Sequence, residues 1–238
     1  MPNKSRPPPI RNHLLAALPG GDYKRLLPHL ESVALPFMEV LHESGELIRH
    51  VYFPDDGLIS LSVVMGDETC REVALIGNEG LLGTAVVLGM NATPTRAIVQ
   101  MPGSAVRMEA EALRDELDRG GALQKLLRRY THALFTQVSQ AAACASAHEV
   151  DERLARLLLL THDGAQGDHF EMKHEFMATI LGVTRSVVTR AAGSFQHERM
   201  IHYTRGQVTI LDRRGLEATA CECYGAVKEE YERSARAS

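Results

Sequence analysis

The chain lacks the features that mark several large classes of protein. Its 238 residues contain no Trp and only 5% aromatic residues. No apolar run approaches the roughly 18 residues that a membrane-spanning helix needs. The N-terminal stretch MPNKSRPPP is polar and rich in proline, so it does not resemble the apolar segment of a secretory signal. We therefore expect a soluble, cytoplasmic protein with no membrane partner.

Cysteine is scarce as well. The four cysteines are Cys70, Cys144, Cys221 and Cys223, and only the last two lie close together in the sequence. This spacing matches neither a disulfide framework nor a zinc-binding template, so we expect reduced thiols and no metal. An oxidant-sensing Cys-x-Cys pair is an open alternative, because thiol reactivity depends on pKa and exposure, which the sequence does not give.

Motifs of catalysis and cofactor binding are missing. The chain has no HExxH, no GxSxG and no phosphate-binding loop in its proper context, so we expect neither an enzyme nor a bound cofactor. Three histidines, His162, His169 and His174, lie near Asp163 and Asp168 in a predicted loop, where polar residues are common. Their spacing fits no metal template, which leaves a regulatory metal there as the weaker alternative.

What the chain does contain is a pattern, HEFMATILGVTRSVVTRAAG over residues 174–193, that predicts two helices joined by a tight turn. Ala178 is small enough to let the two helices approach each other. Gly182 ends the first helix where a residue of positive φ is needed. Val187 and Val188 turn inward from the second helix.

The second helix leaves a polar outer face. Thr184 stands where a hydroxyl can cap it. Arg185, Ser186, Thr189 and Arg190 then point outward, as the N-terminal residues of a recognition helix do when they reach base edges in the major groove. An ordinary helical hairpin with a solvated face is the alternative, and the spacing of Ala, Gly and Val favours DNA binding over it.

A hairpin is predicted next, over residues 201–212, where apolar and polar residues alternate around Arg205 and Gly206. It would form the wing of a winged helix-turn-helix. Lys173 stands where the first helix favours a Ser or Thr cap, and its charge opposes the helix dipole. Residues 173–214 carry a formal charge of +4, whereas the whole chain carries −4. This basic segment suits phosphate contacts and argues against a module that has lost DNA binding.

The N-terminal half has a different pattern of apolar residues. Short apolar or alternating runs recur between Ser32 and Arg107, separated by glycines. Their spacing predicts an antiparallel sandwich or barrel, since no helix that could cross over a parallel sheet fits between them. The six predicted strands are VALPFMEVL, LIRHVYF, GLISLSVVM, REVALI, RAIVQM and SAVRM.

A long helical period follows the predicted strands. Apolar and small residues recur at steps of four and three over about 26 residues, a heptad seam. Packing on the chain's own domain is one explanation, and a two-fold helix pair is the one we favour, because the helix is longer than the face of a small β domain. The predicted dimer contacts are Leu123, Leu127, Tyr130, Leu134 and Ala141; Gln137, Cys144 and His148 continue the seam.

The order of these parts resembles the Crp/Fnr family of bacterial transcription regulators. The motifs that carry the resemblance are ESGE at 43–46, DGLIS at 56–60, GNEGLLG at 77–83 and ATILGVTRSVVTR at 178–190. The expected fold is α+β, with an antiparallel, jelly-roll-like β-roll, a long dimerisation helix and a C-terminal winged helix-turn-helix. The expected domains are a disordered tail (1–12), the effector β-roll (13–120), the dimerisation helix (121–148) and the DNA-binding domain (149–238).

The resemblance implies a homodimer that binds a pseudo-palindromic operator, contacts RNA polymerase and senses an effector in the β-roll. In relatives that bind cyclic AMP, a Glu holds the ribose and an Arg-Ser pair holds the phosphate. Here Leu81 stands in place of that Glu, and Pro94 falls where the Arg belongs, with Arg96 nearby. A buried phosphate without a guanidinium is an unpaired anion, so we expect no cyclic AMP binding by these contacts. This degenerate pocket comprises Gly80, Leu81, Leu82, Gly83, Thr95 and Arg96.

Other sensors of the family are also disfavoured. No cysteine precedes Cys70, so the N-terminal iron–sulfur cluster of the oxygen-sensing branch has no ligands, and no Cys-x-x-Cys-His haem motif occurs. A non-standard cyclic-nucleotide pocket and a metal- or redox-responsive regulator remain the alternatives.

The resemblance also suggests roles on DNA. The family commonly has a Glu where this chain has Ser186, so the usual half-site is not expected. Arg185 and Arg190 match base and phosphate contacts, and Arg190 is suited to donate two hydrogen bonds to guanine. Arg205 and Lys173 are placed to touch phosphates. The predicted DNA-binding residues are Lys173, Thr184, Arg185, Ser186, Thr189, Arg190 and Arg205.

Overall fold

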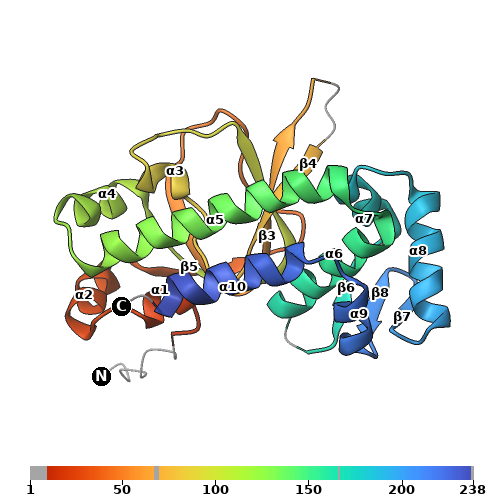
Figure 1. Cartoon of the computed structure of the whole chain (residues 1–238). Helices are drawn as coiled ribbons and strands as arrows, with labels where there is room; N and C mark the ends of the chain where they lie inside the picture. The colour runs from red at the N-terminus through yellow and green to blue at the C-terminus, as the bar shows by residue number, and fades with distance from the viewer. Residues whose placement is uncertain (1–9, 67–69, 166, 237–238) are drawn as a thin grey trace, which may run out of the picture.

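The computed structural model describes residues 10–66, 70–165 and 167–236, and it confirms the α+β class. An antiparallel β domain is followed by a long helix and then by a winged helix-turn-helix (Figure 1). The predicted disordered tail lies outside the described residues up to residue 9. Asn12 does not belong to it: it is fully buried, caps helix α1 (His13–Ala16) and donates hydrogen bonds to the carbonyls of Pro54 and Gly80.

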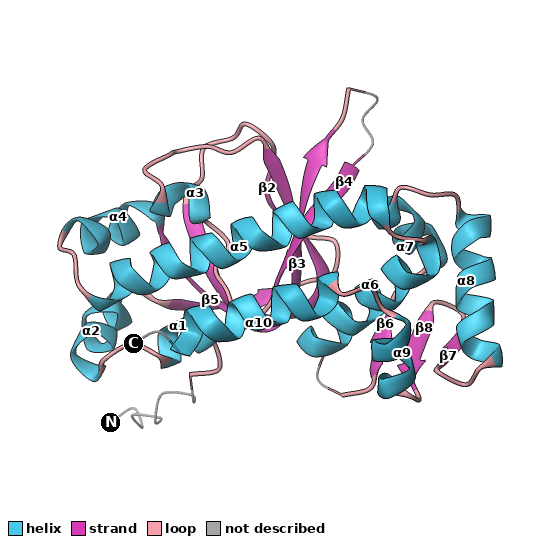
Figure 2. Cartoon of the chain, viewed as in Figure 1, coloured by secondary structure: helices cyan, strands magenta, loops and turns pink. Residues whose placement is uncertain are grey.

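The β domain has one antiparallel sheet of strand order β1-β5-β3-β4, with β2 paired to another part of β5. Two pairs of predicted strands are fused in it, because β3 and β5 each run through without a turn (Figure 2). The strands are β1 (Glu31–Leu35), β2 (Val40–His42), β3 (His50–Val64), β4 (Cys70–Ile76) and β5 (Thr95–Glu109).

Two glycines explain why these strands are fused. Gly57 and Gly103 lie where the register between β3 and β5 shifts. A Cβ on Gly57 would lie 2.7 Å from the carbonyl oxygen of Met101, and a Cβ on Gly103 would lie 2.4 Å from that of Asp56. Both glycines therefore permit close backbone approach at irregularities inside long strands, where the sequence analysis took them for turns.

Helix α5 (Ala122–Ala147) lies along the β domain, and this corrects the predicted dimer seam. Leu123, Leu127, Tyr130 and Leu134 are buried in the chain's own core together with side chains of the sheet. The seam therefore belongs to the protomer, and packing on its own domain explains the heptad period. The smaller helices of this domain are α2 (Gly20–Leu26), the 3-10 helix η1 (Leu27–His29), α3 (Thr84–Val87) and α4 (Ala110–Asp118).

The C-terminal domain has a second core, formed where α6 packs against α7, α8 and α9. Leu75 of β4 joins this core, so the two domains are in contact. The last helix, α10, returns beside α5 (Figure 1). The elements are α6 (Val150–Gly164), β6 (His169–Glu171), α7 (His174–Leu181), α8 (Arg185–His197), β7 (Ile201–Thr204), β8 (Gln207–Ile210), α9 (Arg213–Thr219) and α10 (Cys223–Arg236). None of the helices described is long and apolar enough to cross a membrane.

Glu72 of β4 is half-buried at the contact between the two domains, with its Oε2 atom shielded from solvent. It lines a small cavity together with Arg153 and Arg156 of α6. Burial raises the pKa of Glu72 to about 7, although the Ser60 hydroxyl and Arg156 act in the opposite direction. The folded protein therefore holds this proton at a pH where the unfolded chain has lost it.

This difference predicts a pH-dependent stability. Between the ordinary pKa near 4.5 and the raised value, the folded state binds more protons, so the free energy of unfolding falls as pH rises. Glu72→Gln has no carboxyl proton to lose, so its free energy of unfolding should not fall over this pH range. At pH 8 it should therefore unfold at a higher temperature than wild type, by about 2–4 °C for each kcal/mol of difference in the free energy of unfolding. The difference should shrink at pH 5. Thermal unfolding of both proteins, with exposed Glu39→Gln as the control, tests this; a gain equal at both pH values would contradict it.

Candidate nucleic-acid interface

The helix-turn-helix forms as the spacing predicts. Gly182 ends α7 in the left-handed region, at φ 68° and ψ 32°. The amide of Val183 then donates to the carbonyl of Ala178 at 3.0 Å, which closes the turn. Ala178 and Val188 are buried in the second core, so the small residue and the valine pack α7 against α8.

The outer face of α8 carries the residues predicted to reach DNA. Arg185, Ser186, Thr189 and Arg190 are all exposed. Thr184 is the N-cap by position, but its hydroxyl lies 2.9 Å from that of Ser186 and does not bond the helix backbone. The predicted capping bond is therefore wrong, and the first amides of α8 are left free of that side chain. A helix N-terminus with such amides favours an anion such as phosphate.

The two arginines differ in their surroundings. The Nε atom of Arg185 lies 3.0 Å from a carboxylate oxygen of Glu175 on α7, and both side chains are about two-thirds exposed. An ion pair so exposed contributes little to stability, so Arg185 can exchange Glu175 for a DNA contact at small energetic cost. Arg190 lies one turn beyond Ser186 on the same exposed face.

His174 is a residue of this interface that the sequence analysis assigned only to a possible metal group. Its ring stacks on Tyr203 of β7 with centroids 4.0 Å apart, and its Nδ1 lies 3.0 Å from the hydroxyl of Thr189. Burial, with the nearby Arg185 charge, lowers the pKa of His174, which keeps the ring neutral at neutral pH. His174 thus joins the first helix, the recognition helix and the wing. Its position at the first residue of α7 gave no signal for this role.

The wing forms around Arg205 and Gly206 as predicted. Both have positive φ, 50° and 87°, as a two-residue turn between paired strands requires. Arg205 is exposed at the tip. Lys173 lies beside this turn: a Cβ on Gly206 would be 3.0 Å from its Cγ. The wing gains a third strand, β6, that the sequence analysis read as the end of a loop.

The predicted group of histidines and aspartates does not converge on one point. His162 Nε2 lies 2.8 Å from Asp168, whereas His169 Nδ1 lies 3.1 Å from the hydroxyl of Thr209. Asp163 accepts hydrogen bonds from Arg213 and Tyr224. These residues therefore have structural partners and do not form a ligand set.

Several residues of the predicted effector pocket have partners within the protein. Leu81 and Leu82 are buried in the core, and the hydroxyl of Tyr130 donates to the carbonyl of Leu81 at 3.1 Å. A Cβ on Gly80 would lie 2.4 Å from that hydroxyl, so the glycine allows the tyrosine to pack here. Arg96 pairs with Glu43 at 3.2 Å, and the Thr95 hydroxyl lies 3.0 Å from that of Thr93.

A cavity of about 320 Å³ lies elsewhere, between α1, α5, α6 and α10. Tyr130 and Tyr231 contribute to a lining that is largely apolar. Charged residues also line it, namely Glu79, Asp163, Lys228 and Glu232.

The fold is shared with solved structures of bacterial regulators. A transcriptional regulator assigned to the Crp/Fnr family from Eubacterium rectale has a TM-score of 0.67 at 17% identity, covering 87% of this chain and 96% of that one. FixK2 from Bradyrhizobium japonicum has a TM-score of 0.69 at 15% identity, covering 81% and 98%. The c-di-GMP responsive global regulator CLP from Xanthomonas campestris has a TM-score of 0.60 at 15% identity, covering 81% and 99%. Identities this low establish the fold alone.

The sequence itself matches the Crp-like helix-turn-helix domain over residues 152–219. Residues 152–219 are therefore a Crp-like helix-turn-helix domain, in a chain whose fold is shared with solved Crp/Fnr-type structures. No curated protein matches it in sequence. The matched residues contain α7 and α8, the wing and His174, which together make up the candidate interface.

Proposed function

We propose that this protein is a homodimeric regulator that binds a specific, pseudo-palindromic DNA site through α8 and the wing. The observation that carries the proposal is the exposed face formed by Arg185, Ser186, Thr189 and Arg190 at the N-terminal end of α8. The +4 charge of residues 173–214 on an otherwise acidic chain supports the same reading, because phosphate contacts supply much of the affinity for DNA.

Within this interface, Arg190 and Arg185 read base edges. Arg190 donates two hydrogen bonds to a guanine, and Ser186 replaces the Glu of the usual family half-site, so a different half-site is selected. Arg205 at the wing tip and Lys173 beside it contact phosphates. Thr189 acts mainly through His174, since its hydroxyl is already engaged there.

The dimer uses the outward face of α5. Phe135 is 69% exposed there, and so large an apolar side chain on the surface suggests a binding face. Arg128, His132, Ser139 and Ala142 are exposed at heptad steps on either side of it. A second copy of α5 packed on this stripe would pair the two recognition helices for a two-fold operator.

The effector is not cyclic AMP bound by the usual contacts. Tyr130 and the buried Leu81 support this, since they fill the place of the ribose-binding group. A regulator of this type acts on chromosomal DNA, so we place it in the cytoplasm with RNA polymerase as its further partner. A non-standard nucleotide site is the second candidate, because a regulator of similar fold from Xanthomonas campestris is described as responsive to c-di-GMP.

The first test of this proposal separates residues that read bases from residues that contact phosphates. Arg190→Ala should weaken binding to the best selected site by about 1–3 kcal/mol and flatten the preference at one base position. Arg205→Ala should weaken binding to all DNA sequences alike. It should also lower, by about one, the slope of the logarithm of the binding constant against the logarithm of the salt concentration. Selection of bound DNA followed by titrations at several salt concentrations measures both, with exposed Arg119→Ala of the β domain as the control. An unchanged half-site and affinity in Arg190→Ala would refute the assigned register.

The second prediction concerns the dimer. Phe135→Glu should raise the dimer dissociation constant by roughly tenfold or more, since it replaces about 1.4 kcal/mol or more of apolar contact with a charge. Leu88→Glu is the matched control, because Leu88 is 67% exposed but lies on the β domain. Sedimentation velocity over a concentration series measures the change. A dimer equally tight in both variants would place the interface elsewhere.

The third prediction concerns the effector pocket. Calorimetry with cyclic AMP and cyclic GMP should show no binding at micromolar concentration, because Leu81 offers no hydrogen bond and Arg96 is paired with Glu43. Cyclic di-GMP is the third ligand of the series. A sub-micromolar isotherm for either cyclic mononucleotide that Arg96→Gln abolishes would overturn the prediction.

A further inference from the structure

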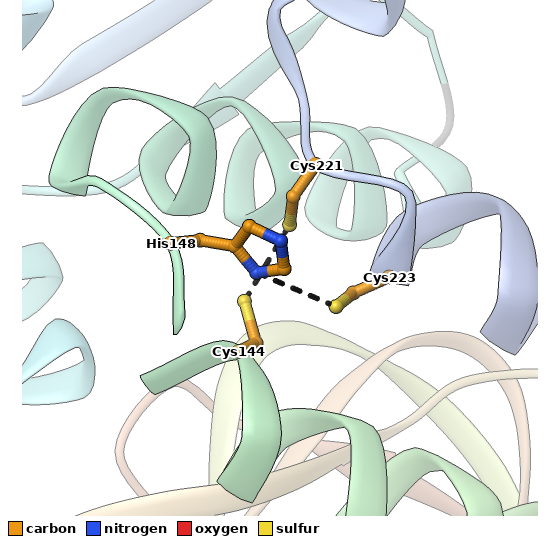
Figure 3. A group of neighbouring side chains, drawn as sticks. All are labelled: Cys144, His148, Cys221 and Cys223. Carbon is orange, nitrogen blue, oxygen red and sulfur yellow. Dashed lines mark hydrogen bonds between the residues drawn. The ribbon is translucent and has the colours of Figure 1, made fainter. Parts of the chain in front are cut away.

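Three cysteines and a histidine that are far apart in the sequence meet at the junction of the two domains (Figure 3). Cys144 lies in the last turn of α5, and His148 follows at its end. Cys223 is the first residue of α10, and Cys221 lies two residues before it. We call these four residues, Cys144, His148, Cys221 and Cys223, the Cys3His cluster. One sulfur or nitrogen atom of each lies within 4.8 Å of those of the others.

The distances fit the edges of one small coordination polyhedron. Four ligands around a tetrahedral zinc ion with Zn–S bonds near 2.3 Å stand about 3.8 Å apart. The Sγ atoms of Cys144 and Cys221 are 3.5 Å apart, and Cys223 Sγ is 3.7 Å from His148 Nδ1. An iron–sulfur cluster would spread its ligands over several irons and so hold them farther apart than this.

A carboxylate beside the cluster orients its histidine. The Nε2 atom of His148 lies 3.2 Å from the carboxylate of Glu222, which directs the other nitrogen, Nδ1, toward the sulfurs. Ligating histidines almost always donate their second ring N–H to such a partner. Buried free thiols need no histidine oriented in this way, so the ligand geometry favours a metal over three thiols packed as small apolar groups.

The site is closed and its charge is compensated. Cys144, Cys221 and Cys223 are 1%, 4% and 2% exposed. Three thiolates and a divalent ion leave a net charge of −1, and Arg153 and Arg156 line the same small cavity as Cys144.

We propose that the Cys3His cluster binds one divalent ion of zinc type and thereby ties the end of α5 to the start of α10. The donor set is soft, four-coordinate and closed, which is typical of structural zinc. Each thiol that ligates the ion releases its proton to solvent, so metal binding is coupled to proton release and to stability. The cross-link spans the junction through which α5 connects the β domain to the DNA-binding domain. This proposal does not depend on DNA binding.

Metal analysis of the full chain tests the proposal. The protein purified under reducing conditions should contain one zinc per chain. After removal by a chelator it should bind one cobalt(II), with the visible bands of a tetrahedral ion and sulfur-to-cobalt charge transfer. Cys223→Ser should lose most of the metal, whereas Cys70→Ser, which removes the cysteine outside the cluster, should keep it. No zinc or cobalt in the wild type, or equal loss in both variants, would overturn the proposal.

A second variant guards against misfolding of Cys223→Ser. The Glu222 side chain is 81% exposed, so Glu222→Ala should fold as wild type does but bind zinc about 10–100-fold more weakly. Glu229→Ala, at an exposed position within α10, is the control. Competition with a chromophoric chelator measures the affinities. Equal affinities in the two variants would contradict the oriented histidine, and a Cys144–Cys221 disulfide in the metal-free protein as isolated, detected by mass, would show that the cluster is a redox pair.

Discussion

The packing of the inner face of α5 on the β domain is the contact on which the rest of the structure depends. Tyr130 is its centre: the side chain is buried, and its hydroxyl bonds the carbonyl of Leu81. Helix α5 is thereby held against the loop that carries Leu81. The same contact fixes the direction of α5, and so the point at which the DNA-binding domain begins. The packing of α5 on the β domain therefore also sets where the helix-turn-helix domain lies.

The local features of the helix-turn-helix were predictable from the sequence because their causes are local. Gly182 predicts a residue in the left-handed region, and Ala178 predicts a close approach of two helices. Arg205 with Gly206 predicts a two-residue turn. Each signal lies within a few residues of the feature that it specifies. The expected capping bond of Thr184 is absent for a reason that is also local: its hydroxyl is hydrogen-bonded to the nearby Ser186 hydroxyl.

Features that depend on distant parts of the chain were missed or misread. The heptad period of α5 correctly identified a buried face but could not say what covers it, and the chain's own sheet does. Gly57 and Gly103 were read as turns, although each instead admits the backbone of another strand. Cys144 and Cys221 are 77 residues apart, so no spacing template could join them. In all three cases the physical cause is a tertiary contact between segments far apart in sequence.

The end of α5 is where the separate parts of the molecule meet. Glu72 of the sheet, Arg153 and Arg156 of α6 and Cys144 of α5 line one small cavity there. Arg153 also donates to the carbonyl of Leu181 at 2.6 Å, immediately before the turn of the helix-turn-helix. A change of charge in this cavity therefore acts on groups bonded directly to the DNA-reading motif. This junction therefore joins the β domain to the helix-turn-helix through direct contacts.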